Sequence, residues 1–265
     1  GKATEIFDLV SRFAGYGFNK SHAAAYALIA YQTAWIKTNY MHEFFVSMMT
    51  QENNNTEKLS LFVEDAKKLG LKILKPCINK SSYEFVIENI SSCEFGIRYS
   101  LSSVKNVGTD AIKKIIQIRE KDGEFKNIDN FLNRVPYSLI TKKSFESLIK
   151  SGAFDKIETN RNKLFKSIDL MLSYCHSIEK EKSSYQSNLF NNDNTNNLLI
   201  NLQDTTKWSF QENINNEFSS LGFYLSAHPL DSYSNSLSKI NVRKSIDIIN
   251  EPKKYVNENI KLCGL

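Results

Sequence analysis

The sequence predicts a mainly α-helical chain with one small β-hairpin. Apolar residues recur at helical spacing over residues 4–70 and again in several runs between 109 and 180. Short runs of strand type occur only between these parts, at 83–87 and 93–99. Ten of the 34 residues in 183–216 are asparagine, and this composition predicts a flexible linker because so few residues there can form a core.

The N-terminal part predicts three helices. The first is amphipathic, with Ile6, Val10 and Phe13 on one stripe. Ser21 is a suitable N-cap for a long helix that runs to about Asn39 and is apolar nearly all round, so we expect it to be buried among other helices. A third helix, 56–69, should end at Gly70.

The remaining elements follow in order. The two strand-type runs predict a hairpin within 71–101, with Pro76 and serine pairs marking its turns. Helices are expected at about 109–119, 128–133, 141–150 and 160–180. After the linker, order should return at 218–233, and residues 260–265 alternate like a first β-strand without a partner. Both ends of the sequence therefore suggest a fragment.

Composition excludes several classes of protein. The four cysteines lie far apart without a Cys-x-x-Cys pair, so we expect reduced thiols and no metal site. No signal peptide is visible, and the longest apolar run, 23–36, is shorter than the roughly 20 residues of a membrane span. We therefore expect a cytoplasmic protein with no membrane partner. No arrangement of residues suggests a catalytic site.

The positive charge is concentrated in one segment. Residues 101–170 contain 14 lysines and arginines but 9 acidic residues, which accounts for the whole net charge of +5. A polyanion partner is expected there, although a lysine-rich solvated face would give the same count.

One glycine-containing loop precedes the long helix. Residues 13–28 read FAGYGFNKSHAAAYAL, so that Lys20, His22 and the free amides of a helix start converge on one place. A phosphate group needs such an arrangement. A capped loop with a solvated lysine and a surface histidine is the alternative.

Two further stretches each resemble half of a tandem helix-hairpin-helix module. Residues 104–112 read VKNVGTDAI and residues 145–155 read FESLIKSGAFD. A tight turn at Gly108 or Gly152 would expose backbone amides at the start of the next helix, and such amides bind DNA phosphates without reading bases. Alternatively, the two glycines only separate packed helices.

The Asn-rich stretch contains a short apolar pair. Leu189 and Phe190 follow Gln186 in the run QSNLF, and they cannot bury themselves within so polar a segment. A pocket on a partner protein is a reasonable destination, although five residues recur by chance.

Together these motifs resemble the bacterial DNA polymerase III alpha subunit family. The glycine loop resembles its fingers signature, QSNLF resembles the peptide by which bacterial polymerases attach to the sliding clamp, and residues 221–231 resemble the segment before its oligonucleotide-binding (OB) barrel. His228 in that segment is interpreted as a structural turn before Pro229.

The resemblance implies roles for individual residues. Nucleotide or template contacts would come from Tyr16, Asn19, Lys20, Ser21 and His22. Duplex DNA contacts would come from Lys105, Val107, Gly108, Thr109, Lys113, Lys142, Lys143, Lys150 and Gly152. Clamp contacts would come from Gln186, Leu189 and Phe190.

The resemblance also implies a domain division and a function. It gives part of a polymerase fingers domain at 1–100, a tandem helix-hairpin-helix module at 101–182, a linker with the clamp peptide at 183–216, a helical pre-barrel segment at 217–254 and the truncated start of an OB fold at 255–265. The full-length parent would synthesise DNA from deoxynucleoside triphosphates, with other holoenzyme subunits as partners and Mg²⁺ held by acidic residues outside this chain.

Two other classes of protein stay open. A non-catalytic helix-hairpin-helix adaptor could use the same hairpins and clamp peptide, although it would have no use for a nucleotide-facing loop. A purely helical scaffold without DNA is disfavoured by the localised charge.

Overall fold

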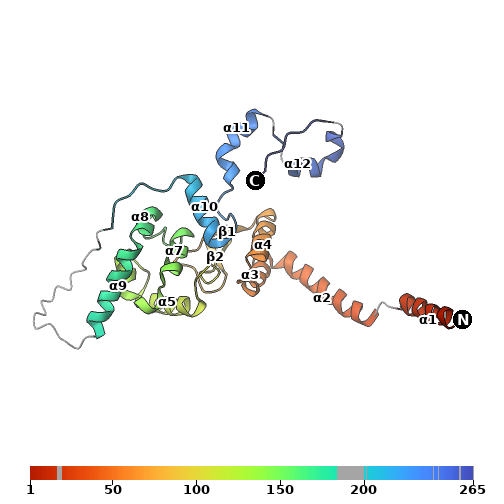
Figure 1. The fold of residues 1–265 in the computed structure, drawn as a ribbon, viewed down its shortest axis with the longest axis horizontal. Coiled ribbons are helices and arrows are strands. Elements are labelled where there is room, and N and C mark those ends of the chain that lie inside the picture. Colours follow the sequence, from red (N-terminus) through yellow and green to blue (C-terminus); the bar gives the residue numbers. More distant parts are fainter. Residues whose placement is uncertain are drawn as a thin grey trace, which may run out of the picture.

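The computed structural model describes residues 1–16, 20–183, 200, 202–240, 242–243, 245–256 and 258–264. Helices dominate it, as predicted (Figure 1). The N-terminal helices are α1 (Lys2–Tyr16), α2 (Lys20–Asn39), α3 (Met41–Gln51) and α4 (Thr56–Lys68). The central helices are α5 (Thr109–Asp122), α6 (Ile128–Arg134), the 3-10 turn η1 (Tyr137–Leu139), α7 (Lys142–Lys150), α8 (Arg161–Lys166) and α9 (Ile168–Ser183). The C-terminal helices are α10 (Phe210–Leu221), η2 (Pro229–Tyr233), α11 (Ser234–Lys239), α12 (Ser245–Asn250) and η3 (Pro252–Tyr255).

The predicted hairpin is present and is part of a three-stranded sheet. β2 (Val86–Ser91) pairs antiparallel with β3 (Glu94–Arg98), and the short β1 (Lys72–Leu74) pairs parallel with β3. The sequence did not predict β1, because three residues are too few to show a strand period. A register shift between Asn89 and Ser91 bends the outer strand.

The core beneath the central helices is built on four phenylalanines. Phe125, Phe131, Phe145 and Phe154 are each at most 1% exposed. The Phe131 ring meets the rings of Phe125 and Phe154 edge to face, with centroid distances of 5.0 and 5.1 Å. It also stacks on the Phe145 ring, with the centroids 6.1 Å apart. Each such ring contributes about 1.5–3 kcal/mol through burial alone. The cluster therefore fixes α6, α7 and the turn after α7 as one unit.

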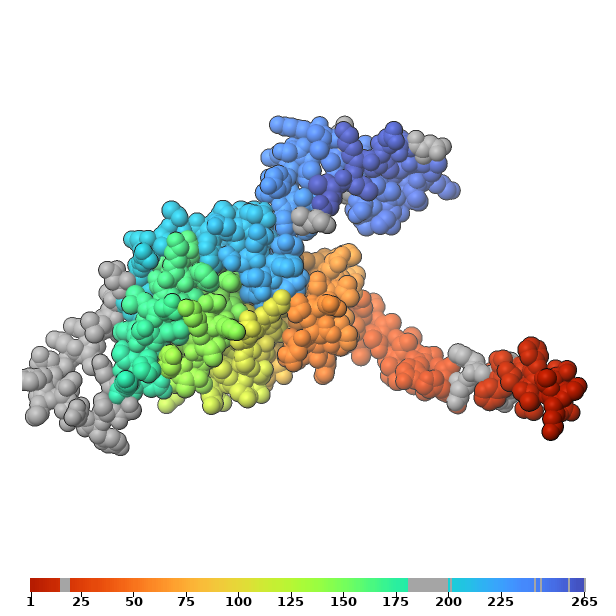
Figure 2. Space-filling view, in the orientation of Figure 1, coloured from red at the N-terminus to blue at the C-terminus, as the bar shows by residue number. Residues whose placement is uncertain are grey.

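The long helix α2 differs from the prediction. None of its residues is buried, and the apolar side chains of Leu28, Ile29 and Trp35 are 59%, 55% and 49% exposed. It projects from the central body, as Figures 1 and 2 show, and touches it mainly through α3. The prediction of a buried helix was wrong for this chain, because the described residues offer α2 no partner along most of its length.

The linker predicted at 183–216 ends earlier than expected. α10 begins at Phe210, where the Ser209 hydroxyl accepts from the Glu212 amide and Glu212 bonds back to the Ser209 amide. This capping box starts a helix despite the neighbouring asparagines. Among the predicted linker residues, 184–199 and 201 lie outside the described part of the chain.

The segment between residue 200 and α10 is held through its backbone. Asp129 accepts from the Ile200 amide at 2.9 Å. The side-chain amides of Asn160 and Asn162 donate to the carbonyls of Thr205 and Thr206, both at 2.7 Å. This returning segment is thus attached to α6 and to the start of α8.

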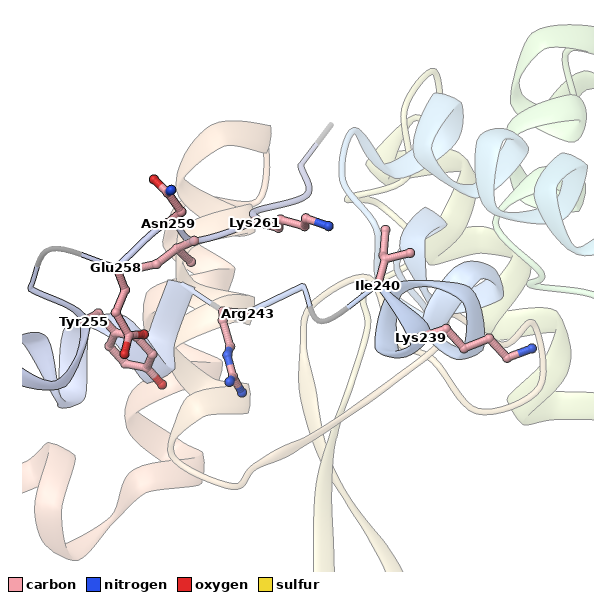
Figure 3. Close-up of a pocket in the computed structure, with 8 residues that line it drawn as sticks. Lys239, Ile240, Arg243, Tyr255, Glu258, Asn259 and Lys261 are labelled. Atoms are coloured by element: carbon pink, nitrogen blue, oxygen red, sulfur yellow. The ribbon is translucent and has the colours of Figure 1, made fainter.

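The C-terminal residues do not form the predicted strand. The described residues among 255–264 make an isolated parallel bridge from Val242 to Lys261, and the described part of the chain offers them no neighbouring strand to complete a ladder. Lys239, Arg243 and Lys261 line an open cavity of about 450 Å³ there (Figure 3). The helix predicted at 160–180 is divided at Ser167, and α3 is an additional helix between the two predicted to end at about Asn39 and to begin at Thr56.

Among the helices of the described residues, none has the length and apolar character needed to cross a membrane.

An ion-pair cluster beside the sheet gives a pH prediction. Arg98 and Lys80 both donate to Glu88 at 2.6 Å, and these hydrogen bonds, that of Arg98 first, lower the pKa of Glu88 from 4.5 to about 2. A depressed folded pKa gives stability above the unfolded value that is lost as the pH falls toward about 2. We expect Glu88→Gln to lower the free energy of unfolding at neutral pH, and the deficit to shrink below pH 4.5, measured by urea unfolding. The exposed neighbour Glu84→Gln is the control, and a deficit independent of pH would contradict the assignment.

Candidate nucleic-acid interface

The first predicted hairpin turns at Asn106 and not at Gly108. Asn106 has φ +64°, the left-handed conformation that asparagine tolerates better than most residues. Its side-chain amide donates to the Ser147 hydroxyl of α7 at 3.2 Å. Gly108 has an ordinary φ of −80°, so its role as the turn-making glycine was predicted wrongly. Its position is nevertheless informative, because it is the N-cap of α5.

The start of α5 is open to solvent. Gly108 is exposed, and no side chain caps the helix. The amides of Thr109 and the two residues after it therefore lack the usual side-chain acceptor, and the positive end of a 14-residue helix is available to an anion. Asp110 adds a negative charge to this turn, so neighbouring lysines must supply the net attraction. Val107, also predicted here, packs partly buried against the core and anchors the turn.

The second predicted corner is closed. Gly152 has φ +82° and is buried, and its amide donates to Ile149 O at 3.1 Å. The flanking amides of Ser151 and Ala153 also donate to carbonyls of α7, at 3.0 Å each. Gly152 was therefore wrongly predicted to face phosphates, because this turn ends a helix and folds into the interior.

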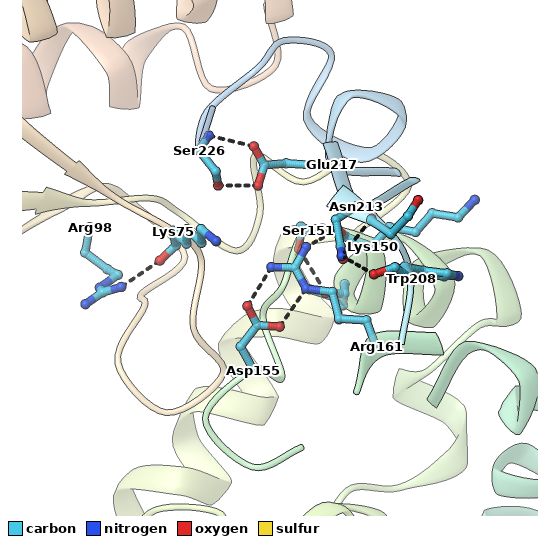
Figure 4. A network of polar contacts seen from close by, with 12 residues as sticks. Lys75, Arg98, Lys150, Ser151, Asp155, Arg161, Trp208, Asn213, Glu217 and Ser226 are labelled. Atoms are coloured by element: carbon cyan, nitrogen blue, oxygen red, sulfur yellow. Dashed lines mark hydrogen bonds and ion pairs between the residues drawn. The ribbon is translucent and has the colours of Figure 1, made fainter. Parts of the chain in front are cut away.

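An arginine explains why the second corner needs glycine. Arg161 donates to both carboxylate oxygens of Asp155, at 2.6 and 2.5 Å, and to Lys150 O at 3.0 Å (Figure 4). A Cβ at Gly152 would stand 2.1 Å from the Arg161 guanidinium. The second corner is thus a structural brace with its cation neutralised by a carboxylate.

The structure places the start of α7 beside the start of α5. Gly108 and Ala111 share a cavity of about 170 Å³ with Thr141 and Ser144. The Thr141 hydroxyl accepts from the Ser144 amide at 3.1 Å, so this helix start is capped internally. The predicted residues Lys142 and Lys143 follow directly and are exposed. The two helix starts and these lysines form the candidate interface.

The other predicted lysines already contact the protein. Lys113 lies 4.9 Å from the Tyr83 ring and Lys150 lies 5.0 Å from the Phe165 ring. The Lys105 amide donates to Ser220 O at 2.9 Å, which fixes the turn against α10. The ring contacts of Lys113 and Lys150 are worth about 1 kcal/mol or less, so their ammonium groups can exchange them for phosphates. The Lys105 ammonium group is not engaged by this backbone hydrogen bond.

Lys142 has a partner of opposite charge. Its ammonium donates to Asp169 Oδ1 at 2.6 Å, and this hydrogen bond raises the pKa of Lys142 above its ordinary value. The side chains are 54% and 78% exposed, so solvent screens the pair. Lys142 is therefore a permanently charged group on the open side of the interface.

Two further lysines lie on the exposed face of α5, and Lys121 is the one that the sequence did not single out. Lys114 and Lys121 line an open cavity of about 510 Å³ between α5 and η1. They are seven residues apart, two helical turns, opposite the buried Ile112, Ile115 and Ile116. This spacing is a readable signal for one solvated face of α5.

The predicted nucleotide-facing residues lie elsewhere. Lys20, Ser21 and His22 form the exposed first turn of α2, and the His22 and Tyr26 rings are 4.5 Å apart. Figure 1 shows that this end of α2 lies far from α5, so the two predicted sites are separate. Tyr16 is the last residue of α1. Asn19 and the predicted clamp residues Gln186, Leu189 and Phe190 lie outside the described residues.

Two smaller predictions can be compared with the structure. His228 caps η2 through its Nδ1 and backbone amide, as expected of a structural turn before Pro229. In the part of the chain that the structure describes, no group of three or more His, Cys, Asp or Glu side chains could hold a metal ion.

Comparison with known proteins identifies the central module. Residues 70–164 match the family model of the helix-hairpin-helix motif, and they include both turns and both helix starts. The central part of the chain is therefore a helix-hairpin-helix module.

Relatives extend the match over almost the whole chain. The DNA polymerase III subunit alpha of Borreliella burgdorferi is 42% identical over 246 residues, covering 91% of this chain and 21% of that protein. The corresponding subunits of Caulobacter vibrioides and Campylobacter jejuni are 38% and 36% identical, covering 85% and 93% of this chain. The chain is thus homologous to one region of the bacterial DNA polymerase III alpha subunits, and the resemblance predicted from the sequence is confirmed. This chain spans about a fifth of the length of these curated relatives.

The two glycines should respond differently to substitution. Gly152→Ala requires a left-handed alanine and displaces Arg161, so we expect a loss of about 2 kcal/mol or more in unfolding free energy, measured by urea denaturation. Gly108→Ala meets nothing within 4 Å and should change stability by about 0.5 kcal/mol or less. Equal effects of the two substitutions would refute this division of roles.

Proposed function

We propose that this chain grips duplex DNA within a bacterial replicative polymerase. The observation that carries the proposal is the uncapped start of α5, which shares a small cavity with Thr141 and Ser144 at the start of α7. That first turn of α7 also carries the exposed Lys142 and Lys143. Backbone amides at a helix start and flexible lysines both suit phosphate oxygens. The homology to DNA polymerase III alpha subunits supports this assignment.

Binding of this kind should be independent of base sequence. The proposed donors are backbone amides and ammonium groups, and neither distinguishes base edges. A polymerase that travels over any template requires this property. The exposed lysines of α5, Lys114 and Lys121, extend the same charged face.

The remaining motifs define further parts of the proposal. Lys20, Ser21 and His22, with Tyr16 and Asn19 nearby in sequence, would face the incoming nucleotide or the template. Their support is the glycine loop at a helix start, together with the homology around it.

A sliding clamp is the proposed protein partner. Gln186, Leu189 and Phe190 would occupy a pocket on the clamp, since two adjacent apolar residues in a polar segment gain most by burial on a partner. Other replicative subunits would join the complex. Catalysis, in this proposal, belongs to the complete polymerase with Mg²⁺ held by residues outside this chain, and the chain alone would not polymerise DNA.

The DNA interface can be tested by its dependence on salt. The chain should bind short duplexes of unrelated sequence equally, with affinity that falls steeply as salt rises. Replacing Lys142 and Lys143 with alanine should lower the log–log salt slope by up to about two, at roughly 0.9 per lost phosphate contact. The control replaces the exposed pair Lys253 and Lys254. An unchanged slope, or an equal change in the control, would exclude the α7 lysines from the interface.

The clamp peptide has a separate test. We expect replacement of Leu189 and Phe190 with alanine to abolish binding to purified bacterial sliding clamp while duplex binding stays unchanged. Surface plasmon resonance on immobilised clamp measures the first effect, and a DNA mobility shift the second. Undiminished clamp binding would show that Leu189 and Phe190 do not attach the chain to the clamp.

A further inference from the structure

A polar groove adjoins the candidate interface. It is an open cavity of about 730 Å³ between η1, the start of α7 and α9. Its polar walls are formed by Tyr137, Ser138, Thr141, Lys142, Asp169 and His176. The Tyr137 and His176 rings meet edge to face at 5.3 Å, which fixes one wall of the groove. None of the residue roles assigned above uses this groove as a whole.

The groove is continuous with the start of α5. Ser138 and Thr141 line both the groove and the small cavity beneath Gly108. A phosphate at the open start of α5 and a second anion in the groove would therefore lie on either side of Thr141. That is a suitable arrangement for two phosphates of the same DNA duplex.

The positively charged group of the groove, the Lys142 ammonium, is already paired with the carboxylate of Asp169. Lys142 donates to Asp169 at 2.6 Å, the contact that it would make with a phosphate oxygen. Asp169 lies in the first turn of α9, where the positive end of that helix favours a negative charge. The carboxylate keeps this favourable interaction with the helix end when Lys142 moves away, and the exposed lysine can change partner at small cost.

We propose that this groove is a second phosphodiester subsite, in which Asp169 occupies Lys142 until a DNA phosphate replaces it. The hydroxyl groups of Tyr137 and Ser138 and the His176 ring supply further hydrogen-bonding groups around that phosphate. The inference rests on the proposed DNA-binding function and adds both a site and a competitor within the protein.

The exchange has a consequence of definite sign. A phosphate can bind the Lys142 ammonium group only after the Lys142–Asp169 ion pair breaks, so the pair weakens DNA binding. Removing the carboxylate should therefore strengthen DNA binding, although most substitutions near an interface weaken it. The gain should require Lys142, because the competition is for its ammonium group.

The test uses the full 265-residue chain and a short duplex of arbitrary sequence, measured by fluorescence anisotropy at several salt concentrations. Asp169→Asn should bind roughly two- to five-fold more tightly, the range expected for releasing one exposed ion pair. The gain should disappear in the Lys142→Ala background, as a double-mutant cycle shows. Asp8→Asn, an equal charge change on the remote helix α1, is the matched control and should have no effect. Thermal unfolding verifies that each variant is folded.

The outcomes separate the subsite from the function on which it rests. If the wild-type chain binds the duplex with steep salt dependence but Asp169→Asn gains nothing, the subsite is wrong and the interface stands. If the gain persists without Lys142, or Asp8→Asn matches it, the effect is one of overall charge and the subsite is again wrong. If the wild-type chain does not bind the duplex, the proposed function fails and the subsite fails with it.

Discussion

The stacked pair of Phe131 and Phe145 is the constraint on which the candidate interface depends. Both rings are fully buried, and both line the small cavity that Gly108 and Thr141 share. Phe131 belongs to α6 and Phe145 to α7, so their contact sets where α7 begins relative to α6. Ile112 and Ile115 of α5 line the same cavity, so α5 packs around the same pair of rings. The positions of two helix starts, and of the amides and lysines on them, thus depend on aromatic packing a few ångströms below the surface.

The two turns of the helix-hairpin-helix module have different roles. The turn at Asn106 leaves its helix start uncapped and open, whereas the turn at Gly152 pairs its amides and receives the guanidinium of Arg161. The closed turn carries the ion pair with Asp155, which neutralises its cation. The turn at Asn106 is therefore available for a ligand, and the turn at Gly152 stabilises the fold.

The sequence predicted most central elements because their signals are local. Apolar spacing placed α5 to α7 within a few residues, and the capping residue Ser209 with Glu212 three positions later was a readable signal for α10 that the asparagine content obscured. The sequence did not show whether a glycine turn faces solvent or the interior. Gly152 would have a left-handed backbone conformation in either case, and the structure places it against Arg161. The pairing of Lys142 with Asp169 joins residues 27 positions apart and needed the packing of α7 on α9. The exposure of α2 likewise depends on what surrounds a helix, which its own residues do not specify.

The segment that returns to α10 has an evolutionary consequence. Asn160 and Asn162 donate to the carbonyls of Thr205 and Thr206, and Asp129 accepts from the amide of Ile200. The held groups are backbone groups that every amino acid except proline, which lacks the amide hydrogen, can supply. Purifying selection should therefore fall on these three side chains and on the buried Leu202, whereas exposed positions of the held stretch such as Gln203 are free to vary. An asparagine-rich neighbourhood can accumulate there by neutral change without loosening the attachment.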